Sequence, residues 1–378
     1  MTLALPSTHE EAWRWSDLSA LPALADAQPE GGIIDTSDLW IGDGPRLLFI
    51  DGKLDTALSR PGPLALGPVD AASDHPLGRL ATGNGWTLTL GRDHAAPGLI
   101  EIVHVATGGA SHLPARITLG EDAQASIVES FVGDGWANRL TRIDLAPNAR
   151  LMRAVRLTQA SGFASIREEA TLGHGASLVT TLLGAGGAGT RIDAAITLAG
   201  PGAYAEFGGA LLARTDQRHD TAIAVRHAAE DGTSRQLWRA VADDQAAASI
   251  AARVEVARGA QKTDGEQSLR GLLLKRTATV NLKPELEIFA DDVKCAHGAT
   301  VGELDARALF YLESRGIPPQ EARALLTRAF VADALDRIGV EAVRDAFVAD
   351  ADAWLNQSPL VPSEVEGRVS TSLDTNGR

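Results

Sequence analysis

Between about residue 98 and residue 290, apolar and polar positions alternate in short runs, which is the pattern of β-strands. The runs 192–198 and 250–256 each carry an aliphatic residue or alanine at every second position. Since successive side chains of a strand point to opposite faces, each run has one apolar face that can be buried.

A short motif recurs at the ends of these runs. Each copy has a leucine, a turn containing Gly, Pro or Asn, and an alanine, and the four alanines are Ala123, Ala149, Ala176 and Ala203, spaced by 26, 27 and 27 residues. A fixed period with strand–turn–strand content is typical of a β-solenoid. About 27 extended residues can close one coil, with the next coil about 4.8 Å above it. The pattern therefore predicts a mainly β fold with a parallel β-helix core, and an antiparallel sandwich is the alternative.

The N-terminal flank has a different pattern. Residues 9–18 read as an amphipathic helix whose Trp13 and Trp15 pack onto their own domain. Residues 46–54 read as a hairpin with the turn Asp51-Gly52. We expect a mixed helical and β region over residues 1–95.

The C-terminal flank becomes helical after Gly298. Residues 300–303 fit a capping box that would start a first helix, Pro318 and Pro319 would start a second, and residues 341–354 form a third. The predicted organisation is a β-helix core over 96–298, a helical bundle over 299–356, and a tail over 357–378. The tail is polar, rich in Ser and Thr and without periodicity, so we expect it to be disordered, and residues 359–378 receive no role.

Composition and charge narrow the possible functions. Aromatic residues make up only 4% of the 378 residues, which suits a narrow interior of small aliphatic side chains. A net charge of −14 disfavours nucleic acid and anionic lipid as partners. One cysteine allows no internal disulfide, and the chain has neither a long apolar run nor a pattern typical of a signal peptide. We therefore expect a cytoplasmic protein with no membrane partner.

Several motifs match a known functional pattern only in part and do not predict that function. The glycine string at 184–189 matches a dinucleotide fingerprint, but a strand pattern follows it rather than a helix, so it is predicted to be a solenoid turn. No GxxxxGK[ST] motif occurs, so any ATP-dependent role must borrow an ATPase. His219 and His227 lie near carboxylates without a second clustered pair, and we expect them in solvated loops.

Two acidic pairs support an alternative function. Asp243 with Asp244, and Asp291 with Asp292, are the kind of paired carboxylates that β-helix enzymes acting on carbohydrates use. A carbohydrate-active enzyme is therefore the second hypothesis, although such enzymes usually act outside the cell.

Cys295 and His297 are the strongest candidates for chemistry. At positions i and i+2 they share one face of an extended segment, so both could bind one soft metal. The ordinary interpretation is a buried structural cysteine beside a loop histidine. Because a tetrahedral site needs four ligands, a second chain would have to supply the rest. If the pair binds a metal, it is therefore half of a site shared across an interface, which also fits the uncapped end of the solenoid.

Residues 283–302, which contain this pair, strongly resemble the C-terminal core of the SufB/SufD family of iron–sulfur cluster assembly proteins. Residues 259–265, 312–317 and 11–18 resemble the same family's final coils, C-terminal helices and N-terminal motif. SufB members carry additional cysteines, whereas this chain has only Cys295, so it is most similar to the SufD branch.

The resemblance implies a right-handed parallel β-helix flanked by helical domains. It also implies a non-catalytic scaffold of the SufBCD complex that pairs with a SufB-like paralogue and docks a SufC-like ABC ATPase on its C-terminal helices. Cys295 and His297 match the family positions that face the SufB interface, where an iron–sulfur cluster would be held transiently and not stably by this chain alone. A homodimer that completes a cluster from two copies is a further possibility.

Overall fold

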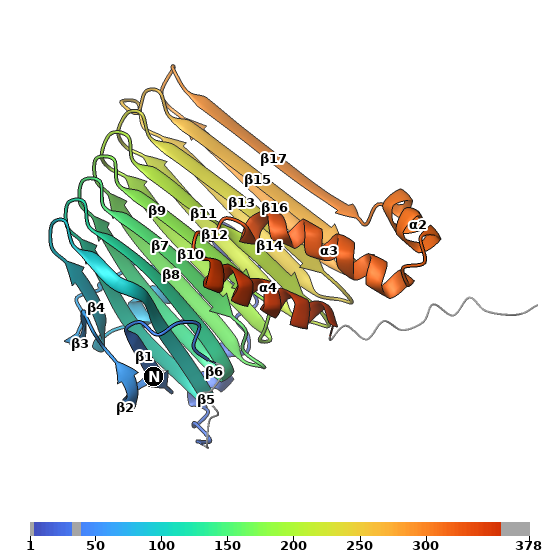
Figure 1. The fold of residues 1–378 in the computed structure, drawn as a ribbon, viewed down its shortest axis with the longest axis horizontal. Coiled ribbons are helices and arrows are strands. Elements are labelled where there is room, and N and C mark those ends of the chain that lie inside the picture. Colours follow the sequence, from blue (N-terminus) through green and yellow to red (C-terminus); the bar gives the residue numbers. More distant parts are fainter. Residues whose placement is uncertain (1–3, 32–38, 357–378) are drawn as a thin grey trace, which may run out of the picture.

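Parallel strands stacked coil upon coil form the body of the molecule (Figure 1). The computed structural model describes residues 4–31 and 39–356, and 17 strands in these residues join in one continuous sheet. The strands are β1 (Arg46–Ile50), β2 (Lys53–Arg60), β3 (Leu64–Pro68), β4 (Asn84–Leu90), β5 (Ala95–Leu119), β6 (Gln124–Leu145), β7 (Arg150–Leu157), β8 (Phe163–Leu172), β9 (Ser177–Gly184), β10 (Gly189–Leu198), β11 (Tyr204–Ala213), β12 (Arg218–His227), β13 (Thr233–Ala242), β14 (Ala247–Val256), β15 (Asp264–Leu273), β16 (Thr279–Ile288) and β17 (Lys294–Glu303). The helices are η1 (Glu11–Trp13), α1 (Leu21–Asp26), η2 (Gly78–Leu80), α2 (Ala306–Ser314), α3 (Pro319–Leu335) and α4 (Glu341–Asn356).

Alternate strands pair with one another, so the coil has two walls. One wall runs β8–β10–β12–β14–β16 and the other runs β7–β9–β11–β13–β15–β17, with every pair parallel. Antiparallel pairing is seen only for β1 with β2 and β3 with β4 within the described residues. The predicted parallel β-helix is confirmed, and the antiparallel sandwich is wrong.

The sequence repeat reflects one corner of the coil. The residue before each repeated alanine adopts the left-handed region, as Asp122 (φ 58°) and Asn148 (φ 56°) do. Its N–H donates to a carbonyl of the next coil, for example Asp122 N to Pro147 O at 3.0 Å. The same corner continues at Asp231 and Lys262, both with φ 58°, where no alanine follows. The repeat in space therefore runs further than the repeat in sequence.

The coil also lengthens along the chain. Phe163 of β8 pairs with Gly189 of β10, 26 residues on, whereas Ala247 of β14 pairs with Thr279 of β16, 32 residues on. The interior nevertheless keeps aligned aliphatic columns, which exclude water from the core. One such column runs from Ile196 through Val225 to Val254.

The N-terminal region is mixed, but its expected helix over residues 9–18 is wrong. Within residues 9–18 only the three-residue η1 is helical, and the separate α1 follows at Leu21–Asp26. Contacts with the solenoid hold this segment instead, since the Arg191 guanidinium lies 4.2 Å from the Trp13 ring centre. Trp13 is buried, and Trp15 is half-buried. The hairpin of β1 and β2 is confirmed, with Asp51 and Gly52 at positive φ in its turn.

The C-terminal helices follow β17 directly. The expected capping box at residues 300–303 is wrong, because these residues are the end of β17, which runs five residues past the expected core boundary at 298. Asp305 caps α2 instead, accepting a hydrogen bond from the N–H of Arg307 at 2.8 Å. The second and third predicted helices are confirmed as α3 and α4. The predicted disorder of 357–378 lies outside the described residues.

Helices α3 and α4 pack on the outer face of the second wall. Val331, Leu335 and Phe347 contribute to an apolar cluster with Leu212 and Val241 of the solenoid. An ion pair between Arg156 and Asp350 at 2.7 Å supports this packing. No helix in residues 4–31 and 39–356 has both the length and the apolar character needed to cross a bilayer.

Candidate functional site

The last two strands of the solenoid leave one end of the stack uncovered. Within the described residues, β16 pairs only with β14 across the stack and β17 only with β15. The outer edges of β16 and β17 therefore present backbone N–H and C=O groups without a strand partner, which makes them a template for another strand. We call the face formed by these two strands the open end.

The side chains on β17 occupy positions that are core positions in the coil below. His297 and Val301 pair in register with Gln267 and Gly271, and both of the latter are buried. His297 is exposed, and Val301 is 45% exposed, because no further coil in residues 4–31 and 39–356 covers them. On β16, Ile288 is 40% exposed above the fully buried Val256. The open end thus has the composition of a core cut in half, which is typical of a surface that a partner covers.

Cys295 points into the end of the core. It is half-buried, packs against the main apolar cluster, and lies in register with Gly265 of β15. A Cβ atom at Gly265 would lie 3.4 Å from the Cys295 sulfur, so the missing side chain leaves room for the thiol. Below it lies Ser234, whose hydroxyl is 2.8 Å from Nε2 of His227.

The Cys295 thiol is not activated within this chain. Burial raises its pKa, and Asp264 also raises it, while the backbone N–H of Gly265 acts in the opposite direction. A reactive cysteine has a lowered pKa, because the thiolate is the nucleophile and the metal ligand. A cation or a positively charged partner group would therefore be needed to favour the thiolate.

Cys295 and His297 remain a pair rather than a complete metal site. They share the inner side of β17, as the i, i+2 spacing predicted. Residues 4–31 and 39–356 contain no group of three or more histidine, cysteine, aspartate or glutamate side chains placed to hold a metal ion. One thiol and one imidazole suit iron or zinc as ligands but fill two of four positions. The described residues thus bring together two side chains, where a tetrahedral site needs four ligands.

The expectation for His219 and His227 is wrong. Both lie in β12 with less than 2% exposure, and burial lowers each pKa to about 4. His219 Nδ1 lies 3.1 Å from the hydroxyl of Thr190 in the neighbouring coil. These histidines are neutral core residues, and no solvated loop holds them.

The two acidic pairs lie at turns and contact lysines of neighbouring coils. Asp244, between β13 and β14, pairs with Lys275, and Asp292, between β16 and β17, pairs with Lys262 at 2.8 Å. Neither acidic pair lines the two surface cavities of about 510 and 330 Å³. The glycine string lies where it was predicted, in the turn between β9 and β10, where Gly187 has φ 73°.

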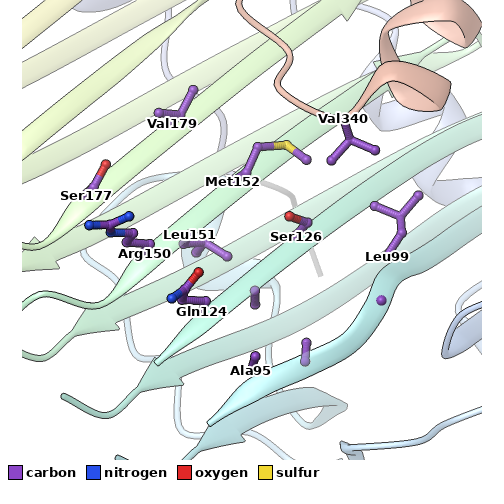
Figure 2. A pocket seen from close by; sticks show the side chains of 13 residues that line it. Ala95, Leu99, Gln124, Ser126, Arg150, Leu151, Met152, Ser177, Val179 and Val340 are labelled. Atoms are coloured by element: carbon purple, nitrogen blue, oxygen red, sulfur yellow. The ribbon is translucent and has the colours of Figure 1, made fainter. Parts of the chain in front are cut away.

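The larger cavity is a groove beside the start of α4 (Figure 2). Leu99, Met152 and Val340 line it, with Arg150 farther along. Among the described residues, its lining has no cysteine, histidine or carboxylate. It therefore offers neither acid–base nor metal chemistry.

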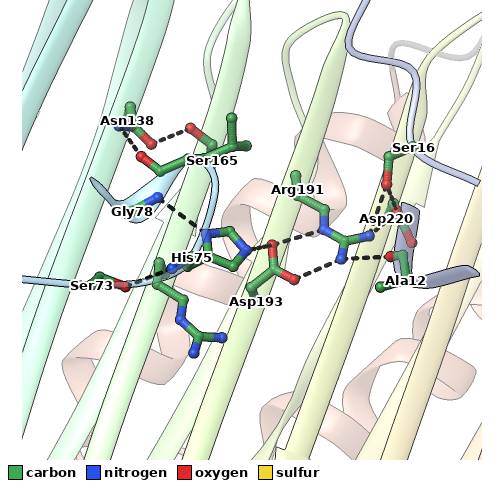
Figure 3. A network of polar contacts seen from close by, with 12 residues as sticks. Ala12, Ser16, Ser73, His75, Gly78, Asn138, Ser165, Arg191, Asp193 and Asp220 are labelled. Atoms are coloured by element: carbon green, nitrogen blue, oxygen red, sulfur yellow. Dashed lines mark hydrogen bonds and ion pairs between the residues drawn. The ribbon is translucent and has the colours of Figure 1, made fainter. Parts of the chain in front are cut away.

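A buried polar network that the sequence did not indicate fixes the N-terminal segment (Figure 3). Arg191 of β10 pairs with Asp193 at 2.6 Å and with Asp220, and its guanidinium donates to the carbonyl of Ala12 at 2.9 Å. The Ser16 hydroxyl also contacts Asp220. Coil register brings Arg191 to Asp220, while Ala12 and Ser16 reach them from the N-terminal segment outside the coil, so no local motif could reveal this network.

Comparison with known proteins gives a consistent result. The model of the family "SUF system FeS cluster assembly, SufBD core domain" matches residues 103–330. The iron-sulfur cluster assembly protein SufD of Escherichia coli (strain K12) is 29% identical over 377 residues, which cover 91% of this chain and 88% of that protein. An iron-sulfur cluster assembly SufBD family protein of Mycobacterium tuberculosis is 28% identical over 370 residues, with the same two coverages. Protein ABCI7, chloroplastic, of Arabidopsis thaliana is 32% identical over 240 residues, which cover 61% of this chain and 50% of that protein.

Proposed function

The chain belongs to the SufBD core family of the SUF system, and on that premise we propose that it is a scaffold subunit of the iron–sulfur cluster assembly complex. In this role it pairs with a SufB-like paralogue through the open end and docks a SufC-like ABC ATPase through its C-terminal helices. The observation that carries the proposal is the open end itself, which presents Cys295 and His297 at core positions that no coil of the described residues covers.

Pairing through the open end would satisfy three features together. A partner strand would take up the free edges of β16 and β17. Apolar side chains such as Ile288, Phe289 and Val301, which are 40%, 60% and 45% exposed, would be buried. The partner would also supply the ligands missing from the pair of Cys295 and His297. A cysteine-rich paralogue fits this need better than a second copy with one cysteine.

Docking of the ATPase is proposed on α2. Every residue of this helix is half-buried or exposed, and α2 stands away from the solenoid (Figure 1). Phe310 and Tyr311 are 73% and 56% exposed, and exposed aromatic side chains are common anchors of protein interfaces. The chain has no GxxxxGK[ST] motif of its own, which agrees with a borrowed ATPase.

The cluster is cargo in this proposal. Iron and sulfide would be held transiently between Cys295, His297 and the partner's ligands, and the chain alone would keep no stable cluster. The protein contributes binding and positioning, and we assign it no catalytic residue. The proposed setting is the cytoplasm, because a chain with one cysteine forms no internal disulfide that an oxidising compartment would favour.

Replacement of His297 tests the site. We expect His297→Ala to lower the activity of an iron–sulfur reporter enzyme severalfold in cells that depend on this chain, because one metal ligand is lost. The melting temperature of the purified variant should stay within 1–2 °C of wild type, since an exposed side chain contributes little to stability. An equal loss of stability and assembly would instead assign His297 a structural role.

Co-purification tests the partners. Tagged chain expressed at its native level should bring down a cysteine-rich paralogue and an ABC ATPase. Recovery of the chain alone, or as a homodimer that binds a cluster on anaerobic reconstitution, would contradict the heterodimer.

A further inference from the structure

Two buried glutamines lie directly below His297 in the stack of coils. Gln236 of β13 pairs in register with Gln267 of β15, and Gln267 pairs with His297 of β17. Both glutamines are 1% exposed. Paired residues of parallel strands point to the same side and lie about 4.8 Å apart, so Gln267 is the next residue below His297 along the stack.

Each glutamine side chain donates a hydrogen bond through its amide nitrogen and leaves its amide oxygen unpaired within the part of the chain that the structure describes. Gln267 Nε2 donates to the carbonyl of Ala252 at 2.8 Å, and Gln236 Nε2 donates to the carbonyl of Arg253 at 3.2 Å. These bonds fix the direction of the two side chains across the core. Both Oε1 atoms are buried without a hydrogen-bond partner among the described residues. A buried unpaired acceptor costs about 1–3 kcal/mol, so an aliphatic residue would serve better if the column had only a packing role.

We propose that Gln267 is a positioning residue for His297. In the complex with the partner, its Oε1, which is unpaired within residues 4–31 and 39–356 of this chain, would accept a hydrogen bond from one ring N–H of His297 and thereby direct the other ring nitrogen toward the shared site. A histidine that binds a metal almost always donates its second ring N–H to a carbonyl or carboxylate, which fixes the tautomer and strengthens the ligand. The inference rests on the proposed function, since it gives His297 the role of a ligand.

Gln236 provides a matched control within the same column. It has the same residue type, the same burial and the same free Oε1, but it lies one coil deeper. At about 4.8 Å per coil, it is about 10 Å from His297 along the stack and cannot reach the imidazole.

The experiment uses the complex of this chain with its cysteine-rich paralogue and ATPase, titrated anaerobically with Co(II) as a visible substitute for Fe(II). We expect Gln267→Leu to weaken Co(II) binding by about 10- to 100-fold, the usual effect of losing such a partner. Gln236→Leu should leave binding within twofold. Gln267→Glu should recover part of the binding, because a carboxylate accepts the same hydrogen bond but lacks the donor that holds the side chain to Ala252. Melting temperatures of the two leucine variants of the isolated chain should change alike, since each loses one amide hydrogen bond and one unpaired buried oxygen.

The outcomes separate this inference from the function on which it rests. Equal effects of Gln267→Leu and Gln236→Leu, or no effect of Gln267→Leu where His297→Ala weakens binding, would overturn the positioning role alone. No Co(II) binding by the wild-type complex, or none lost in His297→Ala, would overturn both. Under the proposal, Gln267→Leu adds nothing to His297→Ala in the double variant.

Discussion

Four histidines of the solenoid strands have a lowered pKa, and three of them are buried while His112 is half-buried. Burial lowers the pKa of His104, His112, His219 and His227 from the ordinary 6.5 to about 4, and Arg139 adds to the effect at His104 and His112. His104 lies between two phenylalanine rings, and its Nε2 is 2.7 Å from a carboxylate oxygen of Glu129. Burial thus disfavours the charged imidazolium form at these four positions.

This arrangement predicts that stability falls in mild acid. Between pH 6.5 and 4 these histidines bind protons in the unfolded chain but stay unprotonated in the folded chain. The free energy of unfolding therefore decreases as the pH falls through this range. Each histidine contributes up to about 1.4 kcal/mol per pH unit, and the contribution is constant above about pH 7. Urea unfolding followed by circular dichroism from pH 4.5 to 8 measures the slope.

A glutamine at position 112 provides the control for this slope. Gln can keep the contact that His112 makes with Asn138 Nδ2, at 3.0 Å, but it does not titrate. The pH dependence of His112→Gln should be shallower than that of wild type. A wild-type midpoint that stays flat down to pH 4.5 would contradict the neutral state of the four histidines.

At the scale of elements, the N-terminal segment depends on one arginine of β10. Removal of Arg191 leaves the carboxylates of Asp193 and Asp220 buried without their cation. Breaking a buried ion pair from one side costs about 3–5 kcal/mol. We therefore expect Arg191→Leu to lower stability by this amount and to make residues 11–17 sensitive to limited proteolysis.

Arg226→Leu on the adjacent β12 is the matched control. Arg226 is 55% exposed and pairs with Glu255 at 3.1 Å, and a surface pair of this kind contributes at most about 1 kcal/mol. Comparable losses in the two variants, measured by urea unfolding, would show that the buried network does not hold the segment.

Helix α2 carries the prediction for ATPase binding. Phe310→Ala combined with Tyr311→Ala should weaken binding of the ATPase at least tenfold by calorimetry, because two exposed aromatic anchors are lost. The fold should be unaffected, since both side chains are exposed. Leu66→Ser, at a 41% exposed position on β3, serves as the control, and an unchanged affinity of the double variant would remove α2 from the interface.

The sequence predicted the coil where the turn motif of a leucine, a turn residue and an alanine recurs at a fixed spacing. After Ala203 the turn keeps its left-handed residue, but Gly232 and Thr263 replace the alanine and the coil grows longer, so the period disappears from the sequence. Residues 300–303 fit both a helix cap and a strand, and pairing of β17 with β15 decides for the strand.

Only the part of the candidate site formed by residues close together in the sequence could be predicted. Cys295 and His297 stand two positions apart, so the alternation of a strand brings them together. Gln267 lies 30 positions before His297 and meets it only through coil register. His219 and His227 lie in β12 and not in solvated loops, because the strand alternation buries them. The charged residues beside them in the sequence hide this alternation.

The whole molecule is a stack with two unlike ends. At the N-terminal end, β1 to β4 cover the first coil, and two of their pairings are antiparallel. At the other end, β16 and β17 have free outer edges within the described residues. An exposed apolar strand edge is a liability unless a partner covers it. Because the end formed by β16 and β17 has these free strand edges, one partner solenoid can pair there. Cys295 and His297 would then lie between the two solenoids.

The most direct test is the affinity of this chain for the proposed cysteine-rich paralogue, measured by light scattering and calorimetry with a charge placed on the open end. Wild-type chain should form a one-to-one heterodimer, and Val301→Glu should weaken it at least tenfold, because a carboxylate would be buried without a partner. Leu66→Glu, on β3 near the covered end, should pair like wild type. A heterodimer that tolerates Val301→Glu but not Leu66→Glu would contradict pairing through the open end.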